Sequence, residues 1–141
     1  MIYYICGKSA VGKDSIFQEL VKRSDLKRII PYTTRPMRPM EKEGEEYHFL
    51  LEEDFLKLLS EGKMMESRSY DTAFGLWYYG TAYEEGFREK GKGFLCIGTL
   101  ESYNSIKDYL GQEFIQPVYI ELEDELRLSR AKAREQGNDP K

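Results

Sequence analysis

Apolar and polar residues follow two different periods along the first part of the chain. Met1 to Cys6 is a short apolar run that ends at Gly7, which predicts a buried strand that enters a turn. From about Lys13 to Arg23 the apolar residues fall on one helical face instead. A strand, a glycine-rich loop and a helix in this order are typical of the opening of an α/β fold.

The middle of the chain predicts a small subdomain of mixed structure. The pattern is extended from Arg28 to Thr34, and prolines then exclude a helix through Arg38. A charged turn follows over Glu41 to Glu46. The elements that we expect next are strands over Tyr47 to Leu51, Met64 to Tyr70 and Leu76 to Gly80, and a helix from Glu52 that ends at Gly62.

The last third returns to alternating helices and strands. We expect a helix from Tyr83 to Lys90 that ends at Gly91, and strands over Phe94 to Ile97 and Ile115 to Leu122. A helix that carries Tyr103, Ile106 and Leu110 separates these two strands, and a final helix begins near Asp124. We therefore expect a single domain over residues 1–141, with a core formed by 1–32 and 84–141 and a subdomain over 33–83.

Composition and charge narrow the classes of function. A chain of 141 residues with 33% charged and 40% apolar residues is long enough to fold around one core. The net charge of -4 argues against a general nucleic-acid binder. The N-terminal apolar run is too short for a signal peptide or a membrane span. We therefore expect neither nucleic acid nor a membrane as a partner, and the sequence does not indicate an oligomeric state.

The cysteines and the histidine bear on location and metal chemistry. Cys6 and Cys96 each lie inside an apolar run, which predicts two buried thiols and a cytoplasmic protein. His48 is the one histidine, so no histidine or cysteine cluster has the spacing of a metal site. A metal ion would have to arrive with a nucleotide.

A phosphate-binding loop is the strongest motif. Residues 7–14 match G-x-x-x-x-G-K at the first seven positions, between the expected strand and helix that the motif requires. Backbone N–H groups would cradle the phosphates of ATP, and Lys13 would reach between the β- and γ-phosphates. A glycine-rich turn that binds nothing is the alternative. The predicted ATP-binding residues are Gly7, Lys8, Ser9, Ala10, Val11, Gly12, Lys13, Asp14 and Ser15.

Position 14 departs from the motif, which has Ser or Thr there. Asp14 is a hard oxygen donor and is our candidate Mg²⁺ ligand, with Mg²⁺ expected as the cofactor that accompanies ATP. The alternative is that Asp14 only interacts with the dipole of the helix that it begins.

Arg35 and Arg38 lie three residues apart on a proline-stiffened strand, ahead of Tyr47. Two guanidinium groups beside a tyrosine suit a phosphate group. The alternative is that these are surface arginines paired with the acidic residues Glu41, Glu43, Glu45 and Glu46.

These motifs together resemble the guanylate kinase family of P-loop nucleoside-monophosphate kinases. The residues that carry the resemblance are the P-loop, T-T-R-x-x-R from Thr33 to Arg38, G-E-x-Y ending at Tyr47, the lone Glu66, and Y-Y-G-T ending at Thr81. The resemblance implies a three-layer P-loop fold with a parallel core sheet and a small mixed subdomain that binds the monophosphate. It also implies ATP-dependent phosphorylation of GMP to GDP.

The same resemblance assigns roles to individual residues. Arg35, Arg38, Tyr47 and Tyr79 would hold the phosphate of GMP, while Glu66 and Thr81, next to Gly80, would read the guanine edge. Arg130 and Arg134 would join Lys13 and Arg35 in catalysis by closing over the transferring phosphoryl group. With Arg127 they share one face of a helix, and a solvated basic face is the alternative.

Three departures from the family leave other functions open. Pro31 replaces a serine, Cys96-Ile97-Gly98 replaces D-x-D, and we expect the family's C-terminal lid, last strand and last helix to be missing from this chain. The two alternatives are a non-catalytic module of the same fold that binds a nucleotide or a phosphopeptide, and a kinase that acts on another acceptor.

Overall fold

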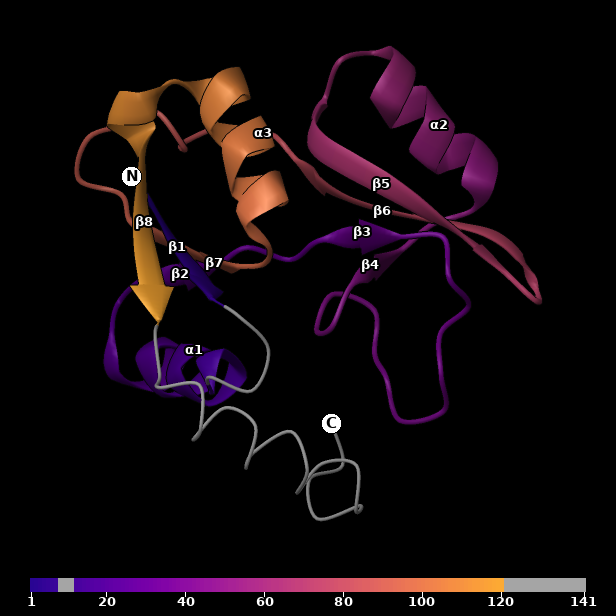
Figure 1. Cartoon of the computed structure of the whole chain (residues 1–141), viewed down its shortest axis with the longest axis horizontal. Helices are drawn as coiled ribbons and strands as arrows, with labels where there is room; N and C mark the ends of the chain where they lie inside the picture. Colours follow the sequence, from indigo (N-terminus) through magenta and orange to yellow (C-terminus); the bar gives the residue numbers. More distant parts are fainter. Residues whose placement is uncertain (8–11, 121–141) are drawn as a thin grey trace.

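The structure, a computed structural model, describes residues 1–7 and 12–120 and contains two β-sheets (Figure 1). In the first sheet all neighbouring strands are parallel and follow the order β2-β7-β1-β8. Its strands are β1 (Ile2–Gly7), β2 (Lys27–Arg28), β7 (Phe94–Ile97) and β8 (Ile115–Ile120).

Helices cover both faces of this parallel sheet. Helix α1 (Lys13–Arg23) lies on one face and α3 (Leu100–Leu110) on the other (Figure 1). Successive side chains of β1 divide between them, because Tyr4 packs in a cluster with Ile106 of α3, whereas Ile5 packs with Phe17 of α1. Burial on both faces explains why β1 is an unbroken apolar run. The predicted three-layer α/β arrangement is confirmed.

The second sheet is mixed and follows the order β4-β3-β6-β5. Its strands are β3 (Tyr32–Thr33), β4 (His48–Phe49), β5 (Met64–Thr72) and β6 (Gly75–Ala82). Helix α2 (Glu52–Ser60) places Phe55, which is fully buried, against Met64 and Ala82. This sheet therefore has a small core of its own.

The register of β5 and β6 decides which side chains meet. Glu66 lies opposite Thr81, and Arg68 lies opposite Tyr79. Residues two apart on a strand, and residues directly opposite each other, share a face of the sheet. These four side chains therefore lie on one face of the hairpin.

The helix predicted over Tyr83 to Lys90 is wrong. The segment forms turns, and Gly86 has φ of 102°, a left-handed conformation that interrupts a helix. Phe87 is fully buried there, with its ring centroid 4.8 Å from that of Phe94. The apolar side chains of this segment therefore pack into the core from a turn and do not form one face of a helix.

The extended segment predicted from Arg28 to Thr34 belongs to two sheets. Arg28 ends β2 in the parallel sheet, and Tyr32 begins β3 in the mixed sheet. The backbone thus crosses between the sheets over residues 29–31. The other predicted strands and helices are present with ends that differ by a few residues, and a short 3₁₀ turn (Gln112–Phe114) precedes β8. Leu122 and the helix expected near Asp124 lie outside the described residues.

Both cysteines are buried on neighbouring strands, as predicted. Burial raises the pKa of the Cys96 thiol to about 12. Within residues 1–7 and 12–120, no helix has the length and apolar character needed to cross a membrane.

Candidate functional site

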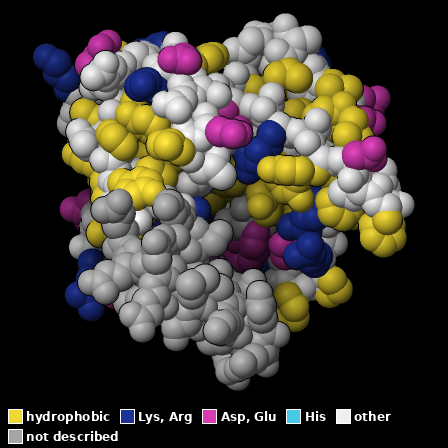
Figure 2. All heavy atoms as spheres, viewed as in Figure 1, with side chains coloured by type: hydrophobic (Ala, Val, Ile, Leu, Met, Phe, Trp, Pro, Cys, Tyr) yellow, Lys and Arg dark blue, Asp and Glu magenta, His cyan; other side chains and the backbone are white. Residues whose placement is uncertain are grey.

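A cavity of about 620 Å³ lies between the two sheets. Figure 2 shows the surface hollowed there, with acidic and basic side chains beside the hollow. The parallel half contributes Asp14 and Gly98, and the mixed half contributes Tyr47, Glu66 and Thr81. Residues predicted for the two different ligands therefore line one space.

The phosphate-loop side of the site begins where β1 ends at Gly7. Gly12 precedes α1 with φ of 81°, a conformation that favours glycine, and its carbonyl accepts the first helical hydrogen bond from Ile16 N–H at 3.1 Å. The Nζ of Lys13 donates to the Gly7 carbonyl at 3.3 Å, which holds the ammonium beside the loop. Free N–H groups in the first turn of a helix attract anions. The predicted phosphate contacts Lys8, Ser9, Ala10 and Val11 lie outside the described residues.

Asp14 and Ser15 are exposed in the first turn of α1, and Asp14 lines the cavity. In residues 1–7 and 12–120 no group of three histidine, cysteine or acidic side chains is arranged to hold a metal ion. Mg²⁺ usually keeps several waters and uses one or two carboxylates together with substrate phosphates. A single carboxylate at a phosphate-binding helix end therefore fits Mg²⁺ that arrives with ATP, and it equally fits a dipole contact.

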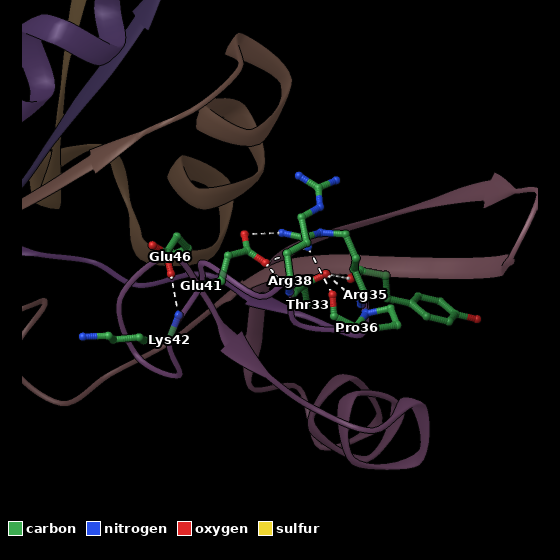
Figure 3. Close-up of polar contacts among 8 residues, drawn as sticks. Thr33, Arg35, Pro36, Arg38, Glu41, Lys42 and Glu46 are labelled. Carbon is green, nitrogen blue, oxygen red and sulfur yellow. Dashed lines mark hydrogen bonds and ion pairs between the residues drawn. The ribbon is translucent and has the colours of Figure 1, made fainter. Parts of the chain in front are cut away.

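Arg35 is held by Glu41 in a two-pronged ion pair (Figure 3). Its Nη1 and Nη2 donate to Oε1 and Oε2 of Glu41, each at 2.8 Å. The N–H of Arg38 donates to the same Oε1 at 2.9 Å. The partner, Glu41, is one of the acidic residues named in our alternative interpretation, but the Arg35 side chain is only 6% exposed, so the pair is nearly buried.

The ion pair shifts the pKa values of both of its members. The hydrogen bonds to Glu41 raise the pKa of Arg35, and those from Arg35 lower the pKa of Glu41 to about 2. The guanidinium also lies 5.4 Å from the ring centroid of Tyr47 and 5.8 Å from that of Phe49. Arg35 is therefore charged and fixed in orientation.

The other predicted phosphate ligands surround this pair. Arg38 is exposed, and its guanidinium extends away from Glu41 (Figure 3). Tyr47 and Tyr79 are half-buried, and their ring centroids are 5.8 Å apart. The structure thus brings Arg35, Tyr47 and Tyr79 together and leaves Arg38 at the rim.

Glu66 and Thr81 form the inner end of the site. Glu66 is 8% exposed, and the Thr81 hydroxyl donates to its Oε1 at 3.4 Å. Gly80 is required by close packing, since a Cβ there would meet the Glu66 carbonyl at 2.9 Å and the Phe55 ring at 3.0 Å. A nearly buried carboxylate at the end of a cavity is suited to accept N–H groups from a ligand.

The sequence interpretation missed Arg68, which lines the same cavity. Its Nη1 donates to Oε1 of Glu66 at 2.6 Å and to Oε2 at 3.1 Å. The signal was available, because Arg68 follows Glu66 by two positions in a predicted strand and must share its face.

Tyr4 was also missed, and it fills the space beside Gly98. A Cβ at position 98 would collide with the Tyr4 hydroxyl and lie 3.2 Å from its Cζ. That hydroxyl donates to the Thr99 carbonyl at 3.1 Å, and burial raises its pKa. Position 98 thus has room for a glycine because the tyrosine ring occupies the space of a side chain.

The expected basic helix face, formed by Arg127, Arg130 and Arg134, lies outside the described residues. The described part of the site therefore consists of the phosphate-loop helix, the Arg35–Glu41 pair with its tyrosines, and the Glu66 end.

Comparison with known proteins gives a consistent family. The model of the guanylate kinase family matches residues 2–136. A guanylate kinase from Thermotoga maritima is 44% identical over 66 residues, which is 46% of this chain and 32% of that protein. A guanylate kinase from Nostoc sp. is 31% identical over 130 residues, which is 87% of this chain and 63% of that protein. This chain thus matches less than two thirds of the length of these relatives.

A solved structure supports the fold. The crystal structure of guanylate kinase from Anaplasma phagocytophilum superposes with a TM-score of 0.66 at 24% identity, over 96% of this chain and 69% of that one. Because the family model spans nearly the whole sequence, this chain belongs to the guanylate kinase family.

Proposed function

We propose that this chain transfers the terminal phosphoryl group of ATP to GMP, giving ADP and GDP. Its family membership supports the reaction. The observation that carries the proposal for this chain is the shared cavity, which is lined by Asp14 at the phosphate-loop helix and by the nearly buried Glu66 and Thr81. One space thereby connects a triphosphate site to a base-reading carboxylate.

Glu66 and Thr81 are the proposed contacts of the guanine base. A carboxylate accepts hydrogen bonds and donates none, and guanine presents two adjacent donors, its N1–H and its 2-amino group. Adenine has an acceptor at N1 and lacks this pair. The low exposure of Glu66 strengthens each bond by keeping water away from it.

Arg35, Arg38, Tyr47 and Tyr79 are the proposed contacts of the GMP phosphate. The guanidinium fork of Arg35 is oriented by Glu41, and a phosphate can take the same two-pronged hydrogen bonds that the carboxylate now takes. Arg38 extends from the rim and is placed to meet the outer phosphate oxygens. The acceptor would thus lie along the line from Glu66 to Arg35.

Residues 7–15 are the proposed ATP site, with Lys13 as its cation. Lys13 neutralises charge on the β- and γ-phosphates, and Arg130 and Arg134 are proposed to close over the transferring group. Mg²⁺ bound with ATP, with Asp14 as a proposed ligand, would supply further positive charge to the phosphates. Gly80 would allow β6 to pack closely against Glu66 and Phe55 beneath the proposed GMP site.

In this reaction the residues would align the two substrates, and none of them would need to accept a proton. The nucleophile is an oxygen of the GMP phosphate, which is already ionised, so no general base is required. We propose that the subdomain over residues 33–83 closes onto the core over 1–32 and 84–141 and excludes water from the reaction. The two buried thiols support a cytoplasmic location for this activity.

Calorimetric titration with GMP, AMP and ATP–Mg²⁺, together with an ADP-release assay, tests the proposal. We expect GMP to bind well ahead of AMP, and ADP to appear only when GMP and ATP are both present. Glu66→Gln should weaken GMP binding about tenfold or more, since the amide loses the charge and one of two acceptors, while ATP binding is kept. Glu19→Gln, at an exposed position of α1, is the matched control. Equal binding of GMP and AMP by the unmodified chain would exclude a guanylate-specific acceptor site.

A further inference from the structure

Arg68 lies between the two ends of the acceptor site. On one side its Nη1 bridges both carboxylate oxygens of Glu66, at 2.6 and 3.1 Å. On the other side its guanidinium carbon is 5.6 Å from the ring centroid of Tyr79, the residue opposite it on β6. Its side chain is 38% exposed and lines the cavity, whereas that of Glu66 is 6% exposed. Arg68 therefore presents donors to the cavity immediately beside the acceptors of Glu66.

The adjacent acceptor and donor match one kind of base edge. In guanine a donor, N1–H, is next to an acceptor, O6, and adenine presents the opposite order at the same two positions. A carboxylate alone can read the donor, and a guanidinium beside it can read the acceptor. Building on the proposed function, we propose that Arg68 is a specificity-determining residue that donates a hydrogen bond to the 6-oxo group of the acceptor purine while Glu66 accepts from N1–H.

The surroundings of the site leave this part of the base to Arg68. Pro31 lines the cavity and has no side-chain donor. Gly98 also lines it without a side chain, and the Tyr4 hydroxyl beside it donates to the Thr99 carbonyl. The Thr81 hydroxyl is directed to Glu66. Two described arginines line the cavity, Arg28 on β2 and Arg68 on β5, and Arg68 is the one whose side chain is hydrogen-bonded to Glu66.

A nucleotide that differs from GMP at one atom separates the possible roles of Arg68. In 6-thio-GMP a weakly accepting sulfur replaces O6, and the N1–H and 2-amino donors remain. Calorimetry should give the unmodified chain a preference of about tenfold for GMP over 6-thio-GMP. In Arg68→Met the affinity for GMP should fall about tenfold, and the preference between the two nucleotides should fall to near one. Arg23→Met removes an exposed pair with Glu19 and should leave both affinities unchanged.

Other outcomes overturn the inference in distinguishable ways. If Arg68 only holds Glu66 in place, or contacts the phosphate, Arg68→Met will weaken both nucleotides by the same factor and keep the preference. Unchanged GMP binding by a folded Arg68→Met also contradicts the inference alone. Arg68→Lys, which retains a cationic donor, should keep part of the preference and guards against a general loss of folding. A chain that binds no purine monophosphate before mutation overturns both this inference and the proposed function.

Discussion

Glu41 accepts hydrogen bonds from both Nη1 and Nη2 of Arg35. A phosphate that approaches Arg35 must displace this carboxylate or share the guanidinium with it. The carboxylate neutralises a nearly buried positive charge, which offsets part of the desolvation cost of burying it. If Arg35 binds the acceptor phosphate as proposed, binding is an exchange of anions at one cation.

The first prediction concerns acid stability. The pKa of Glu41 is about 2 in the folded protein and 4.5 is its ordinary value, so the pair's contribution to stability is complete above about pH 4.5 and is lost as the pH falls toward 2. Urea unfolding at a series of pH values should show Glu41→Gln less stable than the unmodified chain at pH 7, with the gap narrowing below pH 4.5. A gap that stays constant down to pH 3 would contradict the assignment.

A second prediction concerns the contact of Tyr4 with position 98. Gly98→Ala should lower the free energy of unfolding by about 1–3 kcal/mol, because the added methyl group collides with the Tyr4 hydroxyl. Tyr4→Phe removes that hydroxyl and its hydrogen bond to Thr99, at a cost of about 1 kcal/mol. In urea unfolding the double variant should lose less than the sum of the single losses. Strict additivity would show that the two positions do not compete for space.

At the residue scale, the sequence indicated part of the candidate site. The order and spacing of the motifs indicated Glu66 and Thr81, which the structure shows as neighbours at 3.4 Å. The roles of Tyr4 and Arg68 depend on the packing of strands that are distant in sequence, and on which side of a hairpin faces the cavity. No local sequence pattern predicts these contacts, although strand alternation does predict that Arg68 and Glu66 share a face of the sheet.

At the element scale, the apolar runs predicted every strand of the parallel sheet except the two-residue β2. Of its two residues, only Arg28 lay in the longer extended segment that we predicted. β1 and β7 are largely buried, and buried strands have little freedom in their composition, so the signal is strong for these two strands. The segment from Tyr83 to Lys90 shows the limit of the method. Tyr83 and Phe87 are spaced as in a helix, yet Gly86 turns the backbone, and the two rings meet edge to face at 5.8 Å. The same spacing of apolar residues can therefore occur in a buried turn and in a helix.

The third prediction tests how α3 begins. The Thr99 hydroxyl oxygen accepts from the Ser102 N–H at 3.1 Å and satisfies one of the unpaired N–H groups of the first turn. Thr99→Ala should lower the free energy of unfolding by about 1 kcal/mol, and Thr99→Ser should keep most of it. The measurement is urea unfolding followed by circular dichroism. An alanine variant as stable as the unmodified chain would show that the cap contributes nothing.

At the scale of the whole molecule, the two sheets are joined by short crossings. In the described part of the chain the backbone passes between them over residues 29–31 and again over 83–93. The sequence predicted elements of both sheets, but the cavity between them is lined by residues from both, so it depends on how the two sheets pack together. That packing involves residues that are distant in sequence, so the local sequence of either crossing does not predict it.

A fourth prediction concerns the coupling of acceptor binding to global stability. A ligand that binds only the folded state stabilises it by about 2.7 kcal/mol at one hundred times its Kd. GMP at that concentration should therefore raise the free energy of unfolding by about 2.7 kcal/mol, and the urea midpoint should rise by this energy divided by the unchanged slope of the transition. AMP at the same concentration should raise it much less. Equal effects of GMP and AMP would place the stabilising contacts at the phosphate alone.

Tyr4 and Gly98 also constrain the order in which this sequence can evolve. A side chain at position 98 would need the space that the tip of the Tyr4 ring occupies. A single change of Gly98 to aspartate would meet the Tyr4 hydroxyl before it could serve any ligand. Such a change is accommodated more readily after Tyr4 has been replaced by a smaller residue, so the glycine is coupled to a neighbour 94 positions earlier in the chain.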